Sequence, residues 1–231
     1  MRLNGGINFF ENGMTVNIRA MHLQTELFGI LNENMTGFDK VGYQRKDPVV
    51  SSFSEYIGVH GLSTAIDDRV GRIAVTKNPL DLAIAAKGYF QYKSADGIKL
   101  TRDGRFKLDG DGNLLTLENA NVLANDGTPI KLPFTPEKLS DVKVNHNGDI
   151  RVLNKRTGKL EYVATISTVT TDGVAVLDPN IKQGYNEFSN VSQSEEVLQM
   201  IPIRRNFEAN RQLFVLQNSN LSRAIQQLGN G

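Results

Sequence analysis

Cysteine and tryptophan are both absent from the 231 residues of this chain. Without cysteine the protein has no disulfide, no thiol nucleophile and no cysteine-ligated metal site. No apolar run reaches the ~20 residues that a membrane span requires, and the N-terminal residues 1–8 lack the apolar core of a cleavable signal peptide. A charge excess is missing too, since 26 basic and 25 acidic residues give a net charge of +1. We therefore expect neither membrane insertion nor binding to nucleic acid.

Motifs for catalysis, metals and cofactors are also lacking. Asp109–Asn113 begins like a calcium loop, but Leu114 and Ala120 stand where that loop needs Gly and Glu. The three histidines are far apart, and none belongs to a His-Glu-x-x-His pair. There is no phosphate loop and no dinucleotide fingerprint. We expect no catalytic residue, no metal and no cofactor.

The stretch from Ser189 to Leu228 has the pattern of one long amphipathic helix. Ser192 and Glu195 form a capping-box pair at its start. Beyond this cap, large apolar residues recur every seven positions: Met200, Phe207, Phe214, Leu221 and Leu228. A seven-residue period is typical of a helix that supercoils against another helix. Pro202 is expected to kink this helix or to separate its first turns.

A second helical pattern covers residues 12–34, after a loose lead of residues 1–11. Two apolar rows follow the same seven-residue period: Met14, Met21, Phe28 and Met35, and Val16, Leu23 and Ile30. Thr36-Gly37 ends the helix, with Gly37 as a left-handed cap and Phe38 as its hydrophobic contact. Helices with such rows at both termini are able to pair with each other.

The middle of the chain has a different pattern. Residues 39–75 indicate a loop or extended connector, whereas residues 78–179 are rich in Asp-Gly and Asn-Gly turns. Short segments with strand character lie between these turns: Leu82–Ile84, Tyr89–Tyr92, Phe106–Leu108, Val142–Val144 and Tyr162–Val169. This spacing predicts a compact antiparallel sandwich or barrel-like domain.

The predicted fold class is α+β, in which long N- and C-terminal helices, as a coiled-coil pair, flank a mainly antiparallel β domain. We expect four segments along the chain: an N-terminal assembly helix (1–38), an extended connector (39–77), the β domain (78–180), and an extended segment with the C-terminal assembly helix (181–231).

Three stretches resemble one family, the flagellar basal-body rod proteins, which includes proximal and distal rod subunits and the hook protein. They are Asn32–Phe38, the segment from Asn78 to Leu114 with its Asn-Pro-Leu-Asp and Thr-Arg-Asp-Gly-Arg-Phe motifs, and Gln183–Asn210. The chain departs from the family pattern at Phe28-Gly29, where an Asn pair is usual, at Asp39, where a basic residue is usual, and at Pro202. Its length favours a rod subunit over a hook protein, and leaves proximal or distal rod open.

This resemblance implies a structural, non-enzymatic subunit of a tubular axis that transmits torque. It implies localisation in the flagellar basal body after export by the flagellar export apparatus without a cleavable signal peptide. The expected partners are other copies of the chain and other axial rod or hook subunits. The predicted assembly interface comprises Met14, Ile18, Met21, Phe28, Asn32, Asn34, Thr36, Gly37, Phe38, Asn190, Glu195, Met200, Ile203, Phe207, Asn210, Phe214, Leu221 and Leu228.

Two other classes of function stay open at this point. A wall-active enzyme such as a peptidoglycan hydrolase would require a carboxylate pair or a metal triad in the β domain. A β-sheet module that binds a sugar or a peptide would require ligand binding by that domain. The sequence singles out no residues for either function.

Overall fold

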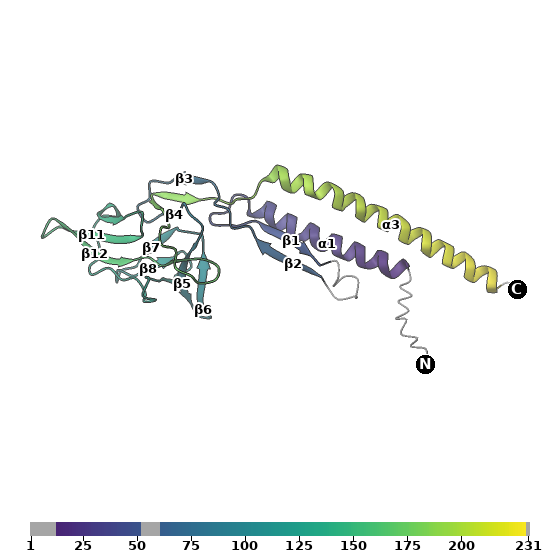
Figure 1. The fold of residues 1–231 in the computed structure, drawn as a ribbon, viewed down its shortest axis with the longest axis horizontal. Helices are drawn as coiled ribbons and strands as arrows, with labels where there is room; N and C mark the ends of the chain where they lie inside the picture. The colour runs from purple at the N-terminus through teal and green to yellow at the C-terminus, as the bar shows by residue number, and fades with distance from the viewer. Residues whose placement is uncertain (1–12, 52–60, 230–231) are drawn as a thin grey trace, which may run out of the picture. The chain divides into compact units, whose positions relative to one another are not determined.

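The computed structural model describes residues 13–51 and 61–229 (Figure 1). The expected lead of residues 1–11 lies outside the described residues. The chain forms two compact units. The first, here called the helical unit, contains residues up to 35, residues 46–65 and residues from 192 onward. The second, the β unit, contains residues 36–45 and 66–191.

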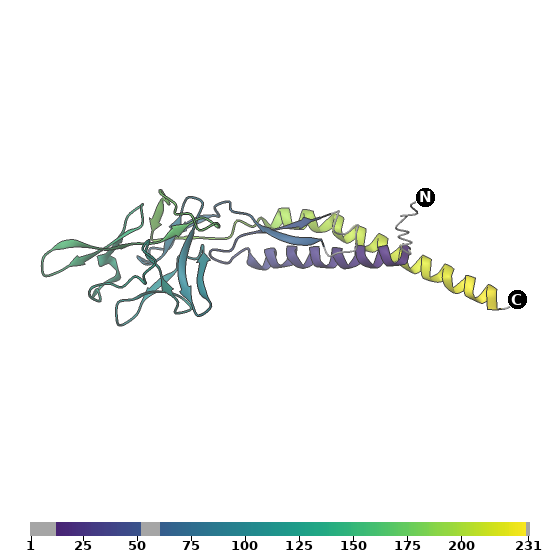
Figure 2. The same cartoon turned by 60° about the horizontal axis from the view of Figure 1, so that its bottom comes forward.

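Among its described residues, the helical unit contains two helices and a pair of strands, here called the hairpin. Helix α1 spans Gly13–Gly37, and its last two residues belong to the β unit. Strands β1 (Lys46–Val50) and β2 (Leu62–Ile66) form a two-stranded sheet. Helix α3 spans Gln193–Gly229 and begins directly after Ser192, where the capping pair predicts a start. In both views α1 and α3 lie side by side with the hairpin (Figures 1 and 2).

Of the two effects expected of Pro202, the separation of the first turns is not observed, because α3 continues through this residue. Proline removes one backbone donor and leaves the carbonyl of the residue four positions earlier, Leu198, without its helical partner. Both Pro202 and Leu198 are exposed. Water is therefore able to solvate the freed carbonyl, which makes the proline tolerable on this side of the helix.

The predicted fold class was wrong in the form stated. The described residues contain two α-helices of unequal length, 25 residues in α1 and 37 in α3, and the strands are not confined to a domain between them. The hairpin β1–β2 shares the compact unit of the helices. The seven-residue rows do not form a shared buried seam either, since Phe28 and Leu221 are exposed. Helical periodicity alone does not reveal a hairpin packed beside the helices.

The β unit is built from short antiparallel strands and one 3₁₀ turn, η1 (Leu139–Asp141). Its strands are β3 (Ile73–Val75), β4 (Leu82–Ile84), β5 (Tyr89–Ser94), β6 (Gly97–Thr101), β7 (Phe106–Leu108), β8 (Leu114–Thr116), β9 (Asn121–Val122), β10 (Val142–Val144), β11 (Asp149–Asn154), β12 (Lys159–Thr165), β13 (Thr168–Val169), β14 (Ile181–Gln183) and β15 (Tyr185–Glu187). The largest sheet has the order β13-β5-β9-β8-β7, and β6 also pairs with β5. A second sheet has the order β10-β11-β12, while β14 pairs with β4 and β15 with β3.

The core of the β unit lies among these sheets. Phe90 and Phe106 meet edge to face at its centre, with ring centroids 5.2 Å apart. Aliphatic side chains from most strands surround the two rings: Leu80, Leu82, Ile84, Leu114, Val122, Ile130, Leu132, Val142, Ile150, Val152, Ile166 and Ile181. The predicted strands Leu82–Ile84, Phe106–Leu108 and Val142–Val144 coincide with β4, β7 and β10.

A buried ion pair fixes one side of this core. The Arg102 guanidinium and the Glu187 carboxylate are 2.6 Å apart, and their side chains are 1% and 3% exposed. Arg102 also donates to the backbone carbonyls of Ile84, Ala86 and Gly88. The second carboxylate oxygen of Glu187 accepts from the backbone N–H of Gly71. One arginine thereby connects the end of β15 to the segment between β4 and β5.

The loop that resembled a calcium site forms a tight turn. A hydrogen bond from the Asn113 side chain, together with those from the backbone N–H groups of Asn113 and Asp111, lowers the pKa of the Asp109 carboxylate. Within residues 13–51 and 61–229, no three metal-ligating side chains cluster, and no helix is both long and apolar enough to span a membrane.

Candidate assembly interface

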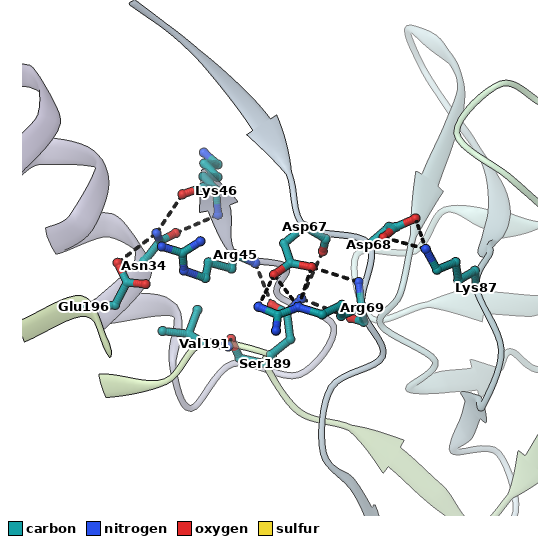
Figure 3. Close-up of polar contacts among 11 residues, drawn as sticks. Asn34, Arg45, Lys46, Asp67, Asp68, Arg69, Lys87, Ser189, Val191 and Glu196 are labelled. Carbon is teal, nitrogen blue, oxygen red and sulfur yellow. Dashed lines mark hydrogen bonds and ion pairs between the residues drawn. The ribbon is translucent and has the colours of Figure 1, made fainter. Parts of the chain in front are cut away.

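Asn34 joins α1 to β1 and α3 (Figure 3). Its side-chain oxygen accepts from the backbone N–H of Lys46 at 2.9 Å, and its amide donates to the carbonyl of Lys46 at 2.9 Å. The same amide donates to the Glu196 carboxylate at 3.1 Å. Asn34 and Glu196 are both fully buried. The Asn34 amide thus pairs with strand β1 as a neighbouring backbone would, and connects α1, β1 and α3.

A second polar contact joins the helices at the far end of α1. Asn17 donates from its side-chain amide to the Gln217 side chain at 3.1 Å. Because Asn34 contacts Glu196 while Asn17 contacts Gln217, the two helices run antiparallel.

The predicted row on α3 lies on its less exposed side over much of the helix. Five residues at alternating spacings of three and four are half-buried: Met200, Ile203, Phe207, Asn210 and Phe214. Beyond Gln217 every described residue except Ser219 is exposed. Leu221 is 52% exposed and Leu228 is 84% exposed. The row therefore has a half-buried part, from Met200 to Phe214, and an exposed part beyond Gln217, here called the open part of α3.

The predicted residues on α1 are spread over several sides of the helix. Met14 and Met21 are half-buried, whereas Ile18, Phe28, Asn32 and Thr36 are exposed. Asn34 and Gly37 are buried, and Phe38 is half-buried. The most buried positions on α1 are Asn17, Leu31, Asn34 and Gly37. Sequence reasoning missed Asn17 and Leu31; the recurrence of Asn17, Leu31 and Asn34 at 14- and 3-residue spacings is the signal that would have located them.

Other large apolar side chains of α3 lie outside this row and are exposed. They are Val197, Leu198, Ile201, Leu213, Val215, Leu216 and Ile225. Glu195, at the first turn, is exposed as well. An exposed apolar surface of this extent along one helix is typical of a surface that contacts another protein.

Asn190 holds together three segments of the β unit. Its side-chain oxygen accepts from the backbone N–H of Arg45 at 2.7 Å, and its amide donates to the carbonyls of Asp67 and Arg69, each at 3.0 Å. The Arg69 guanidinium binds the Asp67 carboxylate and holds the pKa of that group below its usual value. A backbone bond from Asp67 to Arg45 adds to the same arrangement (Figure 3). Asn190 is thus a local structural joint within the β unit.

Comparison with known proteins identifies relatives over nearly the whole chain. Residues 83–152 match the family model of the flagellar hook protein FlgE/F/G D1 domain, and residues 182–227 match that of the flagellar basal body rod FlgEFG protein C-terminal region. The chain is 31% identical to the flagellar basal-body rod protein FlgF of Rhizobium meliloti, over 99% of this chain and 92% of that protein. It is 29% identical to FlgF of Mesorhizobium japonicum, over 90% and 91% of the two chains. It is 27% identical to the rod protein FlgG of Bacillus subtilis, over 85% and 89%.

Proposed function

This chain belongs to the flagellar basal-body rod protein family, and we propose that it is a structural rod subunit that assembles through its two terminal helices. The observation that carries the proposal is the incomplete burial of the helical unit. Of the fully buried apolar side chains among residues 13–51 and 61–229, Leu31 alone belongs to that unit. A helical unit with so small a core gains most of its stability from packing against other subunits.

The open part of α3 supplies the surface for that packing. Burying a side chain of the size of Leu221 contributes ~1.5–3 kcal/mol. Several such residues on neighbouring turns are enough for a specific contact, and the side chains between them are mostly uncharged polar groups. We assign to this assembly surface the predicted helix residues that are exposed in the subunit: Ile18, Phe28, Asn32, Thr36, Glu195, Leu221 and Leu228.

The partners that fit this function are copies of the same chain and other axial subunits of the rod and hook. A tubular assembly requires heterologous contacts, in which one surface of a subunit meets a different surface of the next. Delivery to the basal body by the flagellar export apparatus completes the proposal. A chain without cysteine suits that route, because no disulfide needs to form or be reduced in transit.

The proposal is tested by placing a charge on the open part of α3. Leu221→Asp is expected to abolish swimming when it replaces the native residue in the source bacterium, because the carboxylate would be buried in the contact. The monomer should keep its helix content by circular dichroism, since Leu221 is exposed there. Leu177→Asp is the matched control, because Leu177 is 95% exposed and belongs to the β unit. Normal swimming with Leu221→Asp would refute the assignment of α3 to the assembly surface.

A further inference from the structure

One face of the sheet β10-β11-β12 carries two cations and an aromatic ring in a single row. Lys143 on β10 lies opposite Arg151 on β11, and Arg151 lies opposite Tyr162 on β12. All three side chains are exposed, and Tyr162 is 59% exposed. Because directly opposite residues point to the same face of a sheet, the three side chains form one row across the strands.

The Tyr162 ring is anchored at its hydroxyl end. The register shifts after Ile150, which pairs with Ala164, while Arg151 pairs with Tyr162. Val163 is therefore an extra residue on β12, and this bulge brings Tyr162 and Thr165 to the same face. The Tyr162 hydroxyl lies 2.9 Å from the Thr165 hydroxyl, which donates to the Asp149 carboxylate at 2.6 Å. The Tyr162 ring is thus exposed, and its hydroxyl end is held by the hydrogen bond with Thr165.

The two cations of the row destabilise each other. Like charges directly opposite on neighbouring strands are unfavourable. Within the described parts of the chain, neither the Lys143 ammonium nor the Arg151 guanidinium forms an ion pair or a side-chain hydrogen bond. Asp149 lies near Arg151, and the cation contributes to lowering the pKa of Asp149, after the larger contributions of hydrogen bonds from Thr165 and Asn145. Local stability does not explain the row, which points to an anionic ligand.

We propose that this face, the Lys143–Arg151–Tyr162 row, binds a carboxylated polysaccharide. A sugar ring presents an apolar C–H face that stacks on an exposed aromatic ring, and the fixed Tyr162 ring provides such a surface without ordering cost on binding. The guanidinium and ammonium beside it suit the carboxylates of the same polymer. The Asp149 carboxylate lies on the same face, and its two oxygens accept hydrogen bonds from the Thr165 hydroxyl and the Asn145 amide. An acidic peptide would use the two cations but has no need of the anchored ring.

This inference goes beyond the rod function, because the row belongs to the β unit and shares no residue with the proposed assembly surface. Tyr162 also lies outside the ranges 83–152 and 182–227 that match the family models. Binding and assembly are therefore separable by experiment.

The test measures binding of the full-length chain, at concentrations where it is monomeric, to polygalacturonate by affinity electrophoresis and calorimetry. Tyr162→Ala is expected to weaken binding at least 10-fold, and Arg151→Ala to weaken it similarly with a smaller dependence on salt. Tyr162→Phe keeps the ring but removes its anchor, and should weaken binding about 3-fold. Lys93→Ala, at an exposed lysine of strand β5, is the matched charge control and should bind as the parent does.

Three outcomes would overturn the proposal. One is the absence of binding to polygalacturonate at low salt. Another is binding that Tyr162→Ala leaves unchanged, which would reduce the interaction to nonspecific charge. The third is tighter binding to poly-glutamate than to polygalacturonate, which would assign the face to an acidic protein segment. Neutral dextran should bind at least 10-fold more weakly than polygalacturonate. A swimming assay of Tyr162→Ala reports separately on rod assembly.

Discussion

The helical unit and the β unit differ in which side chains they bury and which they expose. In the β unit, apolar side chains from most strands surround Phe90 and Phe106, and even its buried arginine has four partners. In the helical unit the buried contacts are mainly polar, centred on Asn34 and Asn17, while large apolar side chains of α3 are exposed. The difference supports the proposal that the helical unit, unlike the β unit, is stabilised by neighbouring subunits.

The largest expected effect comes from breaking the buried ion pair of the β unit. Arg102→Met leaves Glu187 charged and buried, and removes the donor to three carbonyl groups. The free energy of unfolding should fall by about 3–5 kcal/mol, measured by urea denaturation. The half-exposed pair Arg105–Asp103 is the matched control, and Arg105→Met should cost less than about 1 kcal/mol. Equal losses in the two variants would contradict the idea that burial makes the Arg102 pair critical.

Hydrogen exchange of the dilute monomer measures the difference in stability between the two units directly. Backbone amides of β5 and β11 should exchange about 100-fold more slowly than those of α3 beyond Gln217, because only the former lie in a packed core. Limited proteolysis should likewise remove the termini first and leave a resistant β unit. Equal protection throughout would mean that the helical unit is stable alone, and would count against assembly-coupled stabilisation.

A smaller effect is expected from removing the Asn34 side chain, which joins α1 to β1 and α3. Asn34→Ala leaves the backbone groups of Lys46 and the Glu196 carboxylate without this partner, and should destabilise the unit by about 2 kcal/mol. Helix content by circular dichroism and the rate of proteolysis of α1 report the change. Asn32→Ala, on the exposed side of the same helix, should be nearly neutral. A neutral result for Asn34→Ala would mean that α1, β1 and α3 are held together by other contacts.

The smallest expected effect is on the stability of the β unit at low pH. Hydrogen bonds from Thr165 and Asn145 lower the pKa of Asp149 below its usual value of 3.8. A lowered folded-state pKa contributes stability above the unfolded-state value, and this contribution is lost as pH falls through the folded-state value. The stability of the β unit should therefore decline below about pH 4 in denaturant titrations, and Asp149→Asn should make that decline shallower. An identical pH profile in Asp149→Asn would exclude a contribution from this carboxylate.

Local sequence patterns predicted individual helices and strands better than they predicted which of these elements pack together. Strands β4, β7 and β10 were located at their observed bounds, because short apolar or alternating segments between turns are a local signal. The row from Met200 to Phe214 was located for the same reason, since it follows the helical period.

The buried polar contacts and the pairing of distant segments could not be predicted from a pattern of apolar residues. The buried position Asn17 is polar, so a search for apolar rows on α1 passed over it, whereas Asn34 was named through the family resemblance. Residues 46–50 and 62–66 lack clear alternation, and their pairing as a hairpin is stabilised by the Asn34 side chain from a different element. The Arg102–Glu187 pair joins residues far apart in sequence, which spacing alone cannot match.

The pairing of β4 with β14 and of β3 with β15 has a consequence for the order of folding. Ile84 pairs with Ile181, and Ile73 with Glu187, so each early strand has its partner about one hundred residues later. A chain that leaves a narrow channel N-terminus first cannot close these sheets until residues 181–187 have emerged. For the export route proposed above, this late closure keeps β3 and β4 unpaired until the end of transit.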